Sequence, residues 1–168
     1  MSEAAPSIEP ATARAPAAFS VRRATRADVP ALAVAVCSLL VELGGRPSPQ
    51  PALQRAAHRL LEEEASVALL VADADGAVVG LLGASWQSAL RIPGRYGLIQ
   101  ELWVHADWRG RTVGGALVSA LCEIARERGV ERLEVGLPGE RFAKVASTEA
   151  FYADNGFTPI GTRMRRLL

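Results

Sequence analysis

The segment that most constrains this chain lies between residues 101 and 117 and reads ELWVHADWRGRTVGGAL. Its first part is apolar up to Val104 and predicts a strand, whereas a helical pattern begins near Val113. A polar loop separates the two. Because the first turn of a helix has free N–H groups and the positive end of the helix dipole, this junction predicts a binding site for a phosphate or pyrophosphate.

The composition of this loop suits an anion. Gly110, Gly114 and Gly115 lack side chains that would keep a phosphate away from the backbone. Arg109 and Arg111 add positive charge at the same place. Neither the dinucleotide fingerprint Gly-x-Gly-x-x-Gly nor the P-loop pattern is present. From these residues alone, a loop that uses glycine only for tight packing stays an alternative.

The whole chain predicts an α/β domain with the element order β-α-α-β-β-β-α-β-α-β. Strands are expected at residues 19–24, 67–72, 78–86, 96–104, 132–137 and 157–167, and helices at residues 28–43, 53–64, 113–128 and 147–154. Such an order predicts a mixed sheet of about six to seven strands with helices on both faces. Residues 1–18 are rich in Ala and Pro and predict a disordered tail, which leaves residues 19–168 as one domain.

Composition excludes several classes of protein. A formal net charge of +1 gives no support for a nucleic-acid partner. The absence of a long apolar run or a signal-like N-terminus predicts a cytoplasmic protein without a membrane span. Cys37 and Cys122 are expected to be reduced, buried thiols. No group of Cys, His and carboxylate residues has metal-ligand spacing, so no metal is expected.

The loop resembles the acetyl-CoA motif of the GNAT acetyltransferases, Arg/Gln-x-x-Gly-x-Gly/Ala. Here it reads RGRTVG over residues 109–114, with Thr112 in place of the first motif glycine. A second block, AFYADNGF over residues 150–157, is similar to the family's Ala-x-x-x-Tyr-x-x-x-Gly-Phe pattern. The asparagine that often opens this helix is absent, and Ser147 or Thr148 stands near its place. The resemblance covers residues 19–166 and implies the GNAT fold.

The resemblance implies acetyl-CoA as cosubstrate, held in a gap where two strands splay apart. Backbone N–H groups near Leu102 and Val104 would bind the acetyl and pantetheine carbonyls, and those from Arg109 to Gly114 would bind the pyrophosphate. The residues expected to bind the cosubstrate are Leu102, Trp103, Val104, Arg109, Gly110, Arg111, Thr112, Val113, Gly114, Gly115, Ser147 and Phe151.

Two residues are candidates for catalysis by the same resemblance. Tyr152 is the expected acid, because a phenol with an ordinary pKa of about 10 can protonate a departing thiolate; a packing role is the alternative. Glu101 is the expected base or amine-orienting carboxylate, because several members of the family have an acid at this place. A lone carboxylate in an apolar strand needs a partner or a solvated cleft, so a salt-bridged structural role is the alternative. His105, Glu134 and water remain alternative bases.

The sequence therefore predicts an N-acetyltransferase in which a primary amine of a small molecule or protein attacks the thioester directly. A non-catalytic acyl-CoA-binding or regulatory module with the same fold is the alternative. The acceptor site is expected in the loops at residues 44–52, 87–97 and 138–147, which do not identify the acceptor. A homodimer is compatible with this prediction.

Overall fold

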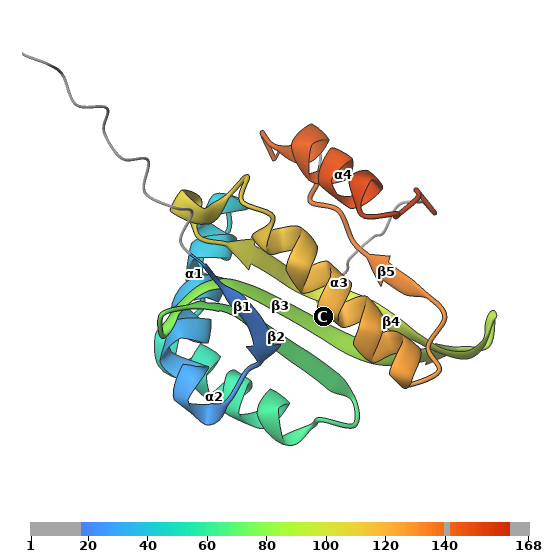
Figure 1. Ribbon diagram of the computed structural model, residues 1–168, viewed down its shortest axis with the longest axis horizontal. Helices are drawn as coiled ribbons and strands as arrows, with labels where there is room; N and C mark the ends of the chain where they lie inside the picture. Colours follow the sequence, from blue (N-terminus) through green and yellow to red (C-terminus); the bar gives the residue numbers. More distant parts are fainter. Residues whose placement is uncertain (1–17, 140–141, 162–168) are drawn as a thin grey trace, which may run out of the picture.

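The computed structural model describes residues 18–139 and 142–161, which form one mixed sheet covered by helices (Figure 1). The strands are β1 (Ser20–Arg23), β2 (Val67–Ala74), β3 (Ala77–Ala89), β4 (Ile92–Val104) and β5 (Leu133–Val135). The α-helices are α1 (Val29–Glu42), α2 (Gln50–Glu62), α3 (Val113–Glu127) and α4 (Val145–Asp154). Two short 3-10 helices, η1 (Arg26–Asp28) and η2 (Ala106–Trp108), precede α1 and α3.

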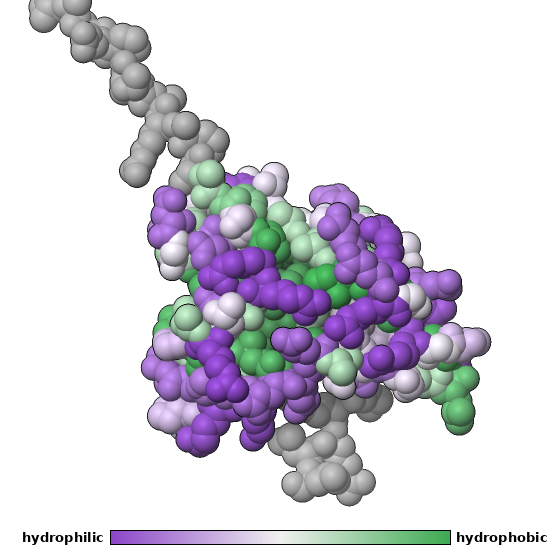
Figure 2. Space-filling view, turned by 60° about the horizontal axis from the view of Figure 1, so that its bottom comes forward, coloured by the Kyte–Doolittle hydropathy of each residue, from purple (hydrophilic) through white to green (hydrophobic). Residues whose placement is uncertain are grey.

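The sheet has the order β1-β2-β3-β4-β5, antiparallel from β1 to β4 and parallel between β4 and β5. The first hairpin turns at Asp75 and Gly76, both with positive φ, as the Asp-Gly pair predicts. The parallel pair needs a crossover, which α3 provides. The tip of the long β3–β4 hairpin protrudes from the molecule, and Figure 2 shows apolar surface at this protruding end.

Helices cover both faces of the sheet and define two cores. The larger core lies between the sheet and α3, and it includes Leu70, Leu82, Leu117, Leu121 and Tyr152. The smaller core lies under α1 and α2, and it includes Val29, Leu32, Val71, Leu81 and Trp103. Alternate residues of the central strands therefore face different helices, as the two-residue period of a strand requires.

A bulge, and the early end of the pairing between β4 and β5, shape the C-terminal part of β4. Gly83 of β3 pairs with Glu101 whereas Ala84 pairs with Ile99, so Gln100 is an extra residue on β4. The pairing of β4 with β5 ends at Ile99 and Val135. From Gln100 to Val104, β4 continues without a neighbouring strand on that edge among the described residues. This opening between β4 and β5 positions the candidate site.

The predicted mixed α/β architecture with helices on both faces is confirmed, with differences at the edges. The described residues contain five strands rather than six to seven. Residues 157–161 form no strand, and the rest of the expected last strand, like tail residues 1–17, lies outside the described residues. β4 begins at Ile92, within the loop expected at residues 87–97, and Ile92 and Tyr96 bury their side chains.

Candidate active site

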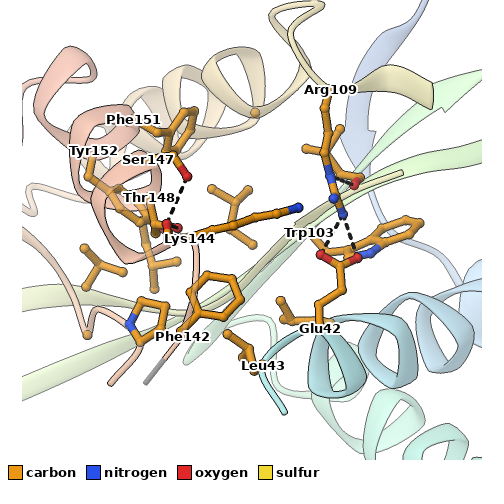
Figure 3. A pocket seen from close by; sticks show the side chains of 18 of the residues that line it. Glu42, Leu43, Trp103, Arg109, Phe142, Lys144, Ser147, Thr148, Phe151 and Tyr152 are labelled. Atoms are coloured by element: carbon orange, nitrogen blue, oxygen red, sulfur yellow. Dashed lines mark hydrogen bonds and ion pairs between the residues drawn. The ribbon is translucent and has the colours of Figure 1, made fainter. Parts of the chain in front are cut away.

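A cavity of about 310 Å³ lies where β4 and β5 diverge (Figure 3). It reaches from the end of α1 across β4 to the start of α4. Its lining residues are Leu39, Glu42, Leu43, Ile99, Gln100, Leu102, Trp103, Val104, Arg109, Gly114, Val135, Gly136, Pro138, Phe142, Lys144, Ser147, Thr148, Phe151 and Tyr152. The cavity thus brings together sequence segments that are far apart along the chain.

Seven of the twelve residues expected to bind the cosubstrate line this cavity: Leu102, Trp103, Val104, Arg109, Gly114, Ser147 and Phe151. The other five, Gly110, Arg111, Thr112, Val113 and Gly115, are not among its lining residues. Val113 is buried in the larger core instead, with 1% of its surface exposed. Of the three loops expected to form the acceptor site, only 138–147 contributes to the cavity, together with the last turn of α1.

The loop before α3 has an open backbone at its centre. Gly110 has a φ of 72°, and a Cβ added there would meet nothing within 4 Å. Thr112, the residue before α3, has a φ of 66°, in the left-handed region that favours glycine. The conformation explains why a glycine suits this position in the GNAT motif. An exposed loop that leads into the N-terminus of a fifteen-residue helix fits a pyrophosphate group.

The side chain of Arg109 points away from this loop. Its Nη2 atom donates to both carboxylate oxygens of Glu42, at 2.6 and 2.8 Å, and its Nε atom donates to the Val104 carbonyl at 3.0 Å. Arg109 therefore joins β4 to the last turn of α1 (Figure 3). Sequence reasoning missed Glu42, because a glutamate at the end of a helix is ordinarily a solvated residue.

Gly114 provides room for an aromatic ring rather than only for a phosphate. A Cβ at Gly114 would lie 3.0 and 3.1 Å from two ring carbons of Phe151 on α4. A Cβ added at Gly115 would lie 3.4 Å from its nearest atom, Oδ1 of Asn155, which is an ordinary contact. The first turn of α3 thus contacts α4 closely at Gly114. Arg111 stacks on the Trp108 ring at 5.5 Å, within the range of a cation–π contact.

Glu101 lies on the face of the sheet covered by α1 and α2, next to Gly83 of β3. Its two neighbours, Gln100 and Leu102, line the cavity, but Glu101 is not among the lining residues. Within the described part of the chain its carboxyl has no hydrogen-bond or ion-pair partner. Burial raises the pKa of this carboxyl to about 7, because desolvation disfavours the charged form. Such a carboxyl can accept a proton near neutral pH.

Tyr152 lies on the opposite face, on α4, and lines the cavity. It is 7% exposed and packs edge-on against Phe151 and Phe157, with ring centroids 5.1 and 5.3 Å away. Burial raises the pKa of its phenol to about 12, so the phenol keeps its proton at neutral pH. The structure thus places Tyr152 and Glu101 on two sides of β4.

The two alternative bases lie elsewhere. His105 follows β4, and its Nδ1 atom accepts a bond from the Asp107 N–H at 3.3 Å. Glu134 on β5 is buried and lies 3.7 Å from Nη2 of Arg91. Neither residue lines the cavity.

The N-terminus of α4 closes the other side of the cavity. The hydroxyls of Ser147 and Thr148 donate to the Lys144 carbonyl at 2.9 and 3.0 Å. The Lys144 side chain extends from α4 across the cavity toward Arg109 and Glu42 (Figure 3). Sequence reasoning missed Lys144, although one signal could have found it: it is the only lysine of the chain.

Two further findings concern the described residues as a whole. In residues 18–139 and 142–161, no three His, Cys, Asp or Glu side chains are grouped as metal ligands would be. No helix in the same residues has the length and apolar character that crossing a membrane requires.

Comparison with known proteins identifies the family. A profile of the acetyltransferase (GNAT) family matches residues 34–157, which include the β4–α3 loop and the whole of α4. The chain therefore belongs to the GNAT acetyltransferase family.

One relative and two solved structures show how far this likeness extends. The mycothiol acetyltransferase of Beutenbergia cavernae is 37% identical over 89 residues, which are 52% of this chain but only 27% of that protein. The structure of the "putative acetyltransferase" from Arthrobacter sp. FB24 is 28% identical with a TM-score of 0.74, covering 95% of this chain and 99% of that one. A transcriptional regulator from Bacillus halodurans, 22% identical with a TM-score of 0.77 over 90% and 100% of the two chains, shares the fold.

Proposed function

We propose that this chain is an N-acetyltransferase that moves the acetyl group of acetyl-CoA to a primary amine of a small molecule or protein. One observation carries the proposal. A single cavity is lined by Arg109 and Gly114 of the loop before α3 and by Tyr152 of α4. A ligand bound through phosphates at that loop would therefore extend toward a phenol that keeps its proton. The name of the mycothiol acetyltransferase relative supports acetyl transfer in general.

The residues fit acetyl-CoA, whose acetyl thioester supplies the group to be transferred. Backbone N–H groups between Arg109 and Gly114 would hold its pyrophosphate, because Gly110 leaves the backbone open and α3 adds its positive end. Leu102 and Val104 lie on the part of β4 beyond Ile99, where the pairing with β5 has ended in the described structure. Their backbone N–H groups would hold carbonyl oxygens in the cavity.

The two titratable residues would divide the proton transfers between the two faces of the sheet. Glu101, with a pKa of about 7, would take a proton from the attacking amine on the α1–α2 face. Tyr152 would give its proton to the departing sulfur on the α4 face. One carbon–nitrogen bond forms, one carbon–sulfur bond breaks, and one proton leaves the amine while another reaches the thiol. The expected cytoplasmic location and homodimer are part of the proposal.

The proposal is tested in two steps. Acetyl-CoA at millimolar concentration should raise the melting temperature, since a ligand that binds only the folded state stabilises it. Release of free thiol is then measured with a panel of primary amines, and each product is checked by mass spectrometry for one added acetyl group. Binding without thiol release from any amine would favour the non-catalytic module, and absence of both binding and release would exclude both functions.

A further inference from the structure

The choice of a lysine at position 144 is unusual for this chain. Of its nineteen basic residues, only Lys144 is a lysine, and all the others are arginines. This single lysine is also one of the residues that line the cavity. A lysine is a compact point charge on a flexible stem, whereas an arginine presents a rigid, planar fork. Besides Arg109, the cavity therefore presents a kind of cation that occurs nowhere else in the chain.

The local structure does not explain this lysine. Lys144 is the N-cap of α4, and its side chain makes no capping hydrogen bond. Helices favour Ser, Thr, Asp or Asn at this position, because those side chains bond the free N–H groups of the first turn. A cation at this end also meets the positive pole of the helix dipole. An asparagine would suit the helix better, so lysine here points to a function outside the helix.

The other charges of the cavity are already compensated. Glu42 and Arg109 neutralise each other through two short contacts. Lys144 makes no ion pair or side-chain hydrogen bond with any residue that the structure describes. The lining of the cavity therefore has a net positive charge, and the lysine ammonium carries it.

A second donor in the same lining also has no acceptor. The Nε1–H group of Trp103 is buried and has no hydrogen-bond partner within residues 18–139 and 142–161. Trp103 itself is 8% exposed and lines the cavity. Buried donors are almost always satisfied, so an unpartnered one needs an explanation. The Ser147 and Thr148 hydroxyls give their hydrogens to the Lys144 carbonyl and do not compete for a ligand's oxygen atoms.

We propose that Lys144 selects an acceptor amine that carries an anionic group, a carboxylate or a phosphate, and binds that group beside the N-terminus of α4. The inference rests on the proposed acetyl transfer and names the class of acceptor. The amine end of such a molecule reaches toward β4, while its anionic end stays at Lys144. Trp103 Nε1–H supplies a second donor for its oxygen atoms. A cavity of about 310 Å³ is at the small end of ligand sites and suits a small acceptor.

Another source of anionic groups is acetyl-CoA itself, whose phosphates could also reach Lys144. The two sources predict different kinetics. If Lys144 binds the acceptor, its loss raises the KM of anionic acceptors and leaves the KM of acetyl-CoA nearly unchanged. If it binds a phosphate of the cosubstrate, the KM of acetyl-CoA rises for every acceptor.

The test uses pairs of amines that differ in one group. They are 3-aminopropanoate with 3-aminopropanamide, and 2-aminoethyl phosphate with 2-aminoethanol. The parent protein should acetylate the anionic member of at least one pair with the higher kcat/KM, and the favoured pair distinguishes carboxylate from phosphate. In Lys144→Asn this preference should fall about tenfold or more, because a hydrogen bond to a charged group is lost. The melting temperature should be unchanged or higher, since Asn is a better N-cap.

Two further variants make the outcome decisive. Lys144→Glu should reverse the preference and favour 1,4-diaminobutane, whose second group is a cation. Arg55→Asn removes the same charge from an exposed position on α2, outside the cavity lining and outside the loops expected to bind the acceptor, and it should keep the parent preference. A neutral amine preferred by the parent, or an unchanged preference in Lys144→Asn, would overturn the inference while leaving acetyl transfer intact. Binding of acetyl-CoA without acetylation of any amine would overturn both.

Discussion

Thr112 holds a left-handed backbone conformation, with a φ of 66°. An L-residue in this region costs about 1–2 kcal/mol, and a β-branched side chain is especially disfavoured there. Thr112→Gly should therefore raise the free energy of unfolding by about 1 kcal/mol, measured by urea denaturation. Thr112→Ala keeps a Cβ in the same conformation and should gain much less. Equal gains in both variants would mean that the backbone strain is not the cause.

Glu101 gives the clearest pH prediction. The folded protein raises the pKa of this carboxyl from 4.5 to about 7 by burial. As a base it must be ionised, so kcat/KM should rise with pH and level off above about 7. Glu101→Gln should lower kcat by about 10²- to 10⁴-fold, and its kcat/KM should no longer rise with pH below about 7.

The same pKa shift has a consequence for stability. The folded state holds the proton more tightly than the unfolded state, so the contribution of Glu101 is fully present below pH 4.5 and is lost as pH rises through about 7. Glu101→Gln should therefore melt at the same or a higher temperature than the parent at pH 8. A lower melting temperature would show that the carboxylate has a structural partner.

Tyr152 tests catalysis against packing. Tyr152→Phe keeps the aromatic contacts with Phe151 and Phe157 and removes only the hydroxyl. If the phenol protonates the leaving thiolate, kcat should fall by about 10²- to 10⁴-fold while acetyl-CoA affinity changes little. Because burial raises the phenol pKa to about 12, this group should cause no alkaline loss of activity below about pH 10. A kcat within about threefold of the parent would leave water as the better acid.

At the scale of elements, the contact between α3 and α4 depends on the absence of one side chain. Gly114→Ala would place a methyl group about 3 Å from the Phe151 ring, so α4 or the ring must shift. We expect a loss of about 1–3 kcal/mol in stability, as for other overpacked sites, together with weaker acetyl-CoA binding. Calorimetric titration and thermal melting on the same samples measure both effects.

Gly115 provides a matched control one residue along α3. Its Cβ would make only an ordinary contact, 3.4 Å from Asn155, and Ala favours a helix interior over Gly. Gly115→Ala should therefore leave the stability unchanged or slightly higher. If both variants lost the same stability, the contact with Phe151 would not be the reason.

At the scale of the whole molecule, one arginine joins the first strand to η1, which follows it directly, and to the distant strand β2. Arg22 on β1 bonds Asp28, next to α1, at 2.8 and 2.9 Å and Asp73 on β2 at 2.6 and 3.1 Å. Arg22 lowers the pKa of Asp28 from 3.8 to about 2 and also lowers that of Asp73. This cluster fixes the start of the domain against the sheet.

Replacing this arginine should destabilise the fold and change its acid sensitivity. Arg22→Gln should lower the free energy of unfolding at pH 7 by about 1–2 kcal/mol, a figure reduced because Arg22 is partly exposed. In the parent this contribution is present above about pH 4 and is lost as pH falls toward 2, because the folded pKa of Asp28 is depressed. Urea denaturation at pH 7, 4 and 2.5 should show the parent and variant converging at the lowest pH. A constant difference would assign the effect to packing.

Local pattern was enough to determine most of the architecture. The two-residue and helical periods predicted the order of the described elements and the start of α3 near Val113. The Asp-Gly pair likewise predicted the turn at Asp75 and Gly76. The strand ends were less predictable, since β4 extends to Ile92 only because tertiary contacts bury that residue. The family likewise could be recognised from the segments at residues 109–114 and 150–157, because both are continuous in sequence.

The tertiary structure alone decided how the site is assembled. The bulge at Gln100 and the short pairing of β5 with β4 create the gap between these two strands. The two cores show that Glu101 and Tyr152 lie on different faces of the sheet. Arg109 and Glu42 are 67 residues apart, and no pattern in the sequence indicates that they form a bond. Sequence determines what each short segment can form, because capping, periodicity and turn chemistry act locally. Which distant side chains share a cavity is decided by packing, since that depends on every element at once.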